Sequence, residues 1–227
     1  MEYLEQVNVQ NFYKSRYLHQ SRSGKTVLAS LAIEEARKLN PQPVVLFFYC
    51  KHENPERDNF LALARSLLGQ LLKQDQGLLY YFYQKCCESG DTVLNSPALL
   101  EELLSFAFQN CKKAYIILDG IDECRRNERK NIVQWFRTLI DNLPPSEPDR
   151  YRCLFVSQDD GVARKDFAGL SSIKISADDN RGDIEEYCKT QAELLRNSLN
   201  LTKEKADSIA EFVTKSTNGT YTYSSNS

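Results

Sequence analysis

The chain has 227 residues, enough for one sizeable domain or one domain and a fragment of a second. With 41% hydrophobic and 26% charged residues, its composition is that of a folded globular protein rather than a disordered or fibrous one. Its 29 basic and 31 acidic residues nearly balance, and no basic run is present that would follow a nucleic-acid backbone, so we expect no nucleic-acid partner.

The sequence also contains no recognisable membrane-spanning or secretory segment. The longest apolar runs, such as residues 44–50, are too short to cross a bilayer, and the N-terminal segment has no signal-peptide core. Seven cysteines form an odd set, several of them in or beside apolar runs, which favours free buried thiols over disulfides or a zinc site. We therefore predict a cytoplasmic protein with no membrane partner.

Helical and strand patterns alternate along the chain, which is typical of a parallel sheet with helical crossovers. The predicted helices cover 26–39, 58–73, 77–88, 96–111, a segment that follows Glu128 and ends at 143–148, and finally 183–199 and 202–216. The predicted strands are the apolar runs 44–50, 114–119 and 152–157, and the weaker run 171–176. The pattern predicts a three-layer α/β fold followed by a short helical extension.

Gly24-Lys25-Thr26 opens the first predicted helix. Helix N-termini hold phosphates because unpaired N–H groups and the positive end of the helix dipole point at the anion. In a phosphate-binding loop, Lys25 would reach the β- and γ-phosphates and the Thr26 hydroxyl would bind Mg²⁺. The full pattern places a glycine five residues before Gly24, where this chain has His19.

The run AYIILDGIDEC, residues 114–124, places three carboxylates directly after an apolar strand. Asp119 would stand at the carboxyl end of that strand, where P-loop enzymes hold Mg²⁺, and Asp122 and Glu123 would polarise the attacking water. The alternative interpretation is a strand followed by an Asp-Gly turn with solvated acids.

Together, SGKTVLAS and YIILDGIDEC resemble the NACHT type of signal-transduction (STAND) P-loop NTPase, in particular the fungal and nephrocystin-like N-terminal domains, over roughly residues 24–218. The resemblance implies a nucleotide-operated switch that binds ATP or GTP with Mg²⁺. By matching positions it implies that Gly24, Lys25 and Thr26 bind the nucleotide, that Thr26 and Asp119 hold the metal, and that Asp122 and Glu123 serve hydrolysis. It also implies protein partners that act through effector and repeat regions outside this chain. Intact relatives assemble into oligomers, which makes an oligomer possible here and leaves the oligomeric state of this chain open.

The chain departs from the family pattern before Gly24. The family's first strand runs straight into the loop, but residues 13–23 are too polar for a central buried strand, so we predict that this strand and the first half of the loop are absent. In the expected strand order 2-3-4-1-5 the gap would be closed by 171–176 or filled by 6–12. A second departure is Ser157-Gln158, where the family often has Ser-Arg to sense the γ-phosphate.

These patterns predict four parts: an irregular or helical segment 1–23, an NTPase core 24–178, the start of a helical subdomain 179–217 and a disordered tail 218–227. The predicted function is a nucleotide-binding switch whose hydrolysis is slow, with NTPase activity only if the P-loop works. Two alternatives stay open: a degenerate, nucleotide-free scaffold module, and an incomplete gene model of such a protein. No motif chooses between ATP and GTP.

Overall fold

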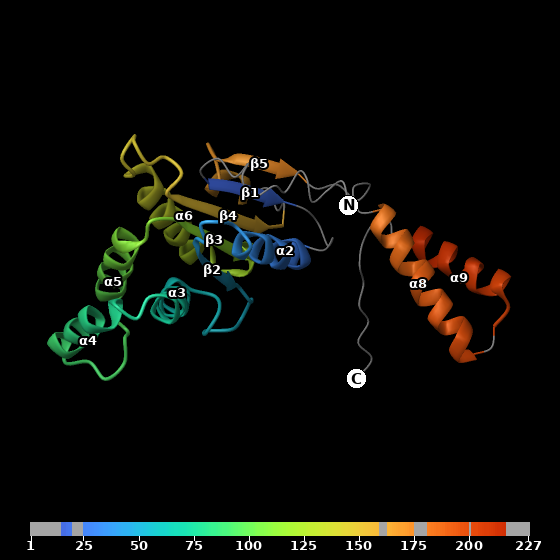
Figure 1. The fold of residues 1–227 in the computed structure, drawn as a ribbon, viewed down its shortest axis with the longest axis horizontal. Coiled ribbons are helices and arrows are strands. Elements are labelled where there is room, and N and C mark those ends of the chain that lie inside the picture. Colours follow the sequence, from blue (N-terminus) through green and yellow to red (C-terminus); the bar gives the residue numbers. More distant parts are fainter. Residues whose placement is uncertain (1–14, 20–24, 159–162, 175–180, 200, 217–227) are drawn as a thin grey trace. The chain divides into compact units, whose positions relative to one another are not determined.

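The computed structural model describes residues 15–19, 25–158, 163–174, 181–199 and 201–216 (Figure 1). The chain divides into two compact units, residues 1–19 with 26–173 and residues 20–25 with 174–227. The first unit contains the sheet and the second is built on two helices. The predicted tail 218–227 lies outside the described residues.

The first unit is built on a five-stranded sheet in the order β2-β3-β4-β1-β5. The pairs β1–β4, β2–β3 and β3–β4 are parallel. The predicted α/β class, a parallel sheet flanked by helices in the order expected for a P-loop NTPase, is confirmed (Figure 1). The strands are β1 Ser15–His19, β2 Val44–Tyr49, β3 Ala114–Asp119, β4 Tyr151–Ser157 and β5 Ser171–Lys174.

The prediction that the first strand is absent is wrong, and residues 15–19 of the segment predicted to be irregular or helical form β1. The rest of that segment, 1–14 and 20–23, lies outside the described residues. β1 lies between β4 and β5 and pairs with β4 from Ser15 opposite Cys153 to His19 opposite Ser157. The physical reason is that backbone hydrogen bonds, which do not depend on side-chain polarity, hold a strand in a sheet. Leaving that side of β4 unpaired would cost about 1–3 kcal/mol for each buried polar group, so a polar segment is recruited to the position.

Helices connect the strands of the first unit. They are α2 Lys25–Arg37, α3 Phe60–Gln74, α4 Leu78–Ser89, α5 Pro97–Asn110, the 3₁₀ turn η2 Ile121–Glu123, α6 Arg126–Asp141 and the short α7 Ala163–Asp166. Their starts follow capping chemistry: the side chain of Asn59 accepts from Ala62 N–H at the start of α3, and Ser96 accepts from Leu99 N–H at the start of α5.

The two faces of the sheet carry different side chains because neighbouring residues of a strand point to opposite faces. Leu46, Ile116 and Phe155 lie on one face, where they pack into a continuous core with Leu63, Leu67, Phe108 and Phe136 of α3, α5 and α6. We call this the leucine face. On the other, α2 buries small residues, Ala29, Ala32 and Ala36, together with Ile33. We call this the alanine face.

The second unit contains α8 Arg181–Leu199 and α9 Lys203–Ser216, which pack against each other. Their buried contact consists of small side chains, Cys188 and Ala192 from α8 and Ala206 and Ala210 from α9. Within the helices that the structure describes, none combines the length and apolar character that a membrane span requires.

Candidate nucleotide site at the end of strand β3

The end of β3 and the start of α2 meet through one hydrogen bond. The Thr26 hydroxyl donates to Oδ2 of Asp119 at 2.7 Å, across 93 residues of sequence. Asp119 is buried, with 5% of its surface exposed, whereas Thr26 is exposed. The two predicted metal-binding residues are therefore in direct contact, at the edge of the sheet where β3 ends.

The chain turns sharply immediately after Asp119. Gly120 has a φ of 70°, and a β-carbon at this position would lie 3.2 Å from the Cys50 carbonyl oxygen. Glycine adopts this left-handed conformation without the steric cost that other residues meet. The turn leads into η2, so that Asp122 and Glu123 follow within one 3₁₀ turn.

Asp122 and Glu123 each accept a hydrogen bond from the loop after a neighbouring strand. Oδ1 of Asp122 accepts from Gln158 N–H at 2.8 Å, after β4. Oε2 of Glu123 accepts from His52 N–H at 3.0 Å, after β2. The predicted acid pair thus connects the ends of β2, β3 and β4, a bracing role that the sequence motif did not reveal.

The oxygen atoms at this position suit a hard divalent cation. Mg²⁺ prefers oxygen ligands and is usually held by one or two protein groups together with substrate phosphates and water. A hydroxyl and a carboxylate in contact provide such a pair. No cluster of three or more His, Cys, Asp or Glu side chains suited to a metal is present in the described part of the chain. A metal shared with phosphates fits these residues better than an all-protein cage.

The remaining predicted nucleotide contacts lie just before Thr26. Lys25 is the first residue of α2 and is partly exposed. Gly24 and the rest of 20–24 lie outside the described residues. His19, which stands where the family has its first glycine, is the last residue of β1. The segment between the end of the strand and the start of the helix therefore coincides with the predicted loop.

Two buried thiols, Cys50 and Cys124, lie next to the Gly120 turn, and no sequence pattern predicts that they meet. A hydrogen bond with the Cys124 thiol, together with burial, raises the pKa of Cys50 well above its ordinary value. Both side chains are buried, and they pack as small, largely apolar groups. All seven cysteines are free, as predicted.

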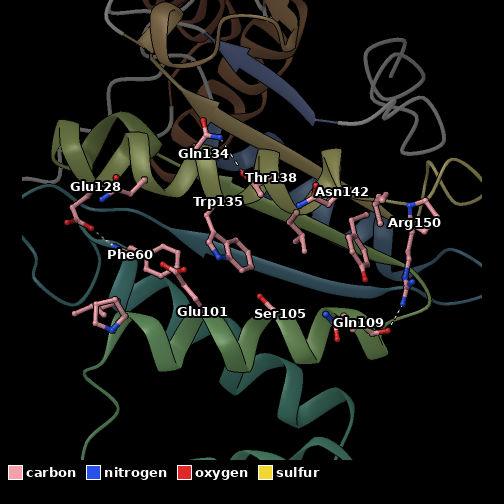
Figure 2. Close-up of a pocket in the computed structure, with 17 residues that line it drawn as sticks. Phe60, Glu101, Ser105, Gln109, Glu128, Gln134, Trp135, Thr138, Asn142 and Arg150 are labelled. Carbon is pink, nitrogen blue, oxygen red and sulfur yellow. Dashed lines mark hydrogen bonds between the residues drawn. The ribbon is translucent and has the colours of Figure 1, made fainter.

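A separate hollow of about 830 Å³ lies between α5 and α6 (Figure 2). Glu101, Ser105 and Gln109 reach into it from α5, one turn apart, and Trp135 faces them from α6. The Trp135 ring packs against Phe136 at a centroid distance of 4.9 Å and against Phe60 at 6.0 Å. Trp135 is thus a packing residue, as predicted, but the hollow beside it was not foreseen.

The sequence of this unit matches a known protein family. Residues 19–158, more than half of the chain, match the family described as Nephrocystin 3, N-terminal. The chain belongs to this family. The match includes Lys25, Thr26, Asp119, Asp122 and Glu123, and begins at the last residue of β1.

A curated relative and solved structures show weaker likeness. The chain is 27% identical over 106 residues to the vegetative incompatibility protein HET-E-1 of Podospora anserina, a stretch that covers 44% of this chain and 8% of that protein. The ORC2 protein of Aeropyrum pernix, in its ADP form, superposes with a TM-score of 0.47 at 14% identity, over 85% of this chain and 50% of that one. A Walker-type ATPase of Pyrococcus abyssi gives a TM-score of 0.47 at 13% identity, over 92% and 61%.

Proposed function

We propose that the chain is the nucleotide-binding module of a signal-transduction switch of the NACHT type, and that it binds ATP or GTP with Mg²⁺ where β3 ends. The observation that carries the proposal is the 2.7 Å hydrogen bond between the Thr26 hydroxyl and the Asp119 carboxylate. A P-loop threonine and a strand-end aspartate are the two protein groups that hold Mg²⁺ in P-loop NTPases.

Each predicted residue has a defined place in the proposal. Gly24 and Lys25 contact the phosphates, since the N-terminus of α2 directs N–H groups and a positive dipole end toward the loop. Thr26 and Asp119 hold the metal, which supplies charge neutralisation to the phosphates when bound. Asp122 and Glu123 orient the water for a slow hydrolysis, because a switch depends on long-lived states.

The acid pair also gives the module a way to report its state. Because Asp122 and Glu123 bond to the loops after β4 and β2, a shift of η2 toward bound phosphate would be felt at His52 and Gln158. We propose that these loops change with nucleotide and that larger assemblies read the change. The similarity to HET-E-1, of which the chain covers 8%, supports a place within a longer signalling protein.

A titration with fluorescently labelled ATP and GTP in the presence of Mg²⁺ tests the proposal. We expect saturable binding to the wild type and its loss in Lys25→Ala. Lys38→Ala is the matched control, since Lys38 lies just beyond the other end of α2 and pairs with Glu35. Equal, negligible signals from the wild type and Lys25→Ala would contradict the proposal.

A nucleotide-free scaffold is the second candidate, and one observation favours it. The hydrogen bonds of Asp122 and Glu123 to the loops after β4 and β2 are a structural role, which a scaffold needs and which requires no nucleotide. If the module is a scaffold, Asp122→Ala and Glu123→Ala, which remove the accepting oxygens, should lower its thermal stability, and Mg²⁺ with ATP or GTP should not raise the melting temperature of the wild type.

A further inference from the structure

Strand β2 stands at one end of the strand order, so only its inner side pairs with another strand. Its outer backbone groups bond instead to two side-chain amides from α3. Gln70 accepts from Phe47 N–H at 3.0 Å and donates to Phe47 O at 2.7 Å. Gln74 accepts from Val45 N–H at 3.2 Å and donates to Val45 O at 3.1 Å.

This pairing copies the bonding of a neighbouring strand. In an antiparallel ladder, paired residues exchange both N–H···O bonds, and the exchange recurs at every second residue. Gln70 and Gln74 lie one turn apart on α3 and meet alternate residues of β2 in that way. An uncovered edge is a template for pairing with another chain, and covering it blocks such pairing. The two carboxamides therefore occupy the bonding positions of a missing strand.

The space beside β2 is otherwise hollow. A hollow of about 440 Å³ is lined by Phe47, Phe48 and Tyr49 of the strand and by Gln70 of α3. A second hollow of about 350 Å³ lies along Val45 and Phe47, with Gln70 and Gln74 in its wall. Between them the hollows are lined by Val45, Phe47, Phe48 and Tyr49 of β2, along the edge where an added segment would lie.

The charges around these hollows favour an acidic occupant. Arg57 and Arg65 line the first hollow together with Glu56, and Arg37 and Lys73 line the second. Arg37 also lies over the Phe47 ring, 5.5 Å from its centroid, which holds a positive charge beside the strand. Four cations therefore face one carboxylate. Edge-to-edge pairing with a second copy of this chain would bring like charges together, which disfavours it.

We propose that the outer edge of β2 binds an extended acidic peptide segment by strand addition, and that Gln70 and Gln74 cover the edge until the segment displaces them. Main-chain hydrogen bonds to Val45 and Phe47 give affinity in this mode of recognition, and alternate side chains give specificity. The basic residues beside the hollows select acidic side chains. The surface is separate from the proposed nucleotide site, and it does not depend on nucleotide binding.

The test uses a short fluorescein-labelled peptide of alternating threonine and glutamate, measured by fluorescence anisotropy with the whole chain. We expect saturable binding to the wild type and about tenfold tighter binding to the Gln70→Ala/Gln74→Ala variant, because the competing amide bonds are gone. Gln84→Ala, which alters a glutamine of α4 that bonds to Glu88, should bind like the wild type. A peptide with N-methyl groups on alternate residues, and one with lysine in place of glutamate, should not bind.

Binding of the N-methylated peptide to the wild type tests strand addition even if the double variant does not fold. Binding that survives N-methylation would overturn strand addition, since charge alone would then explain it. No binding to either protein would overturn the proposal. If light scattering shows the double variant as a dimer that the peptide does not dissociate, the occupant is a second copy and the acidic-peptide proposal is wrong.

Discussion

The leucine face and the alanine face of the sheet have opposite construction. The leucine face buries large side chains, among them Phe108, Phe136 and Phe155, with no more than a trace of exposed surface. The alanine face meets α2 through small side chains. A gap of about 10 Å³ lies between α2 and the strands β3 and β4. Apolar burial therefore concentrates on one face, and the predicted site residues Thr26 and Asp119 lie on the other.

The difference suggests a division of labour. Large buried side chains supply most of the free energy of folding, whereas small ones let a helix approach the sheet closely. α2 carries Thr26 at its start and brings that hydroxyl to Asp119. Substitutions on the leucine face should thus change stability, and those at the end of the alanine face should change ligand binding.

The largest effect is expected from Phe136→Ala on the leucine face. Phe136 is fully buried, and its ring meets Trp135 and Phe155. Removing such a ring leaves a cavity and costs about 3–5 kcal/mol. Urea denaturation measures the loss, and Val27→Ala on the exposed side of α2 is the control. An effect below that of Val27→Ala would break the comparison.

Gly120→Ala should produce the next largest effect. The residue has a φ of 70°, and its β-carbon would lie 3.2 Å from the Cys50 carbonyl oxygen. We expect a loss of about 1–3 kcal/mol from the strained backbone. Gly69→Ala is the matched control, because Gly69 lies within α3 and a β-carbon there meets nothing within 4 Å. That change should be neutral or stabilising, so equal losses would refute the account of the turn.

Ala32→Leu should show that the alanine face has no spare room. Ala32 is buried, and the adjoining gap of about 10 Å³ is about the size that one water molecule needs. Overpacking of this kind costs about 1–3 kcal/mol. Thermal unfolding and labelled-nucleotide binding should both weaken, since α2 must move away from the sheet. Val27→Leu, on an exposed position of the same helix, should leave both unchanged.

Tyr151→Phe should have the smallest effect, and that effect depends on pH. The Tyr151 hydroxyl donates to the Phe108 carbonyl, and burial raises its pKa to about 12 from 10.0. Near neutral pH the variant should lose about 1 kcal/mol. Above pH 10 the tyrosine ionises in the unfolded chain but not in the folded one, so the wild type becomes less stable as the pH rises toward 12. The difference in the free energy of unfolding between the wild type and the variant therefore narrows over this range. Tyr80→Phe, at an exposed position, is the control and should leave stability near neutral pH unchanged.

Much of the architecture was predictable because the spacing of apolar residues along the sequence reflects which side of each helix or strand is buried. The apolar run 114–119 became β3 with the predicted bounds, and Ser96 with Pro97 marked the start of α5. Thr26 and Asp119, which the family resemblance assigned to one metal site, are in contact. Such elements can be predicted locally because the apolar residues that make each pattern recognisable are the ones that the fold buries.

The missed features depend on partners distant in sequence. β1 has no apolar periodicity, and the need of β4 for a backbone neighbour places it in the sheet. In the sequence, Gln70 and Gln74 are ordinary polar positions of a helix. Their amides bond to the edge of β2, a contact that only the tertiary structure shows. The bonds of Asp122 and Glu123 to loops after other strands likewise depend on tertiary structure.

Isothermal titration calorimetry of ATP and GTP, with Mg²⁺ and with EDTA, tests the central claim most directly when the wild type is compared with Asp119→Asn. The substitution keeps an oxygen to accept from Thr26 and removes the charge that would hold the metal. We predict that binding to the wild type weakens about tenfold or more without Mg²⁺, and that the variant binds weakly in both conditions. Wild-type affinity that is the same with and without Mg²⁺, or no binding at all, would contradict the account.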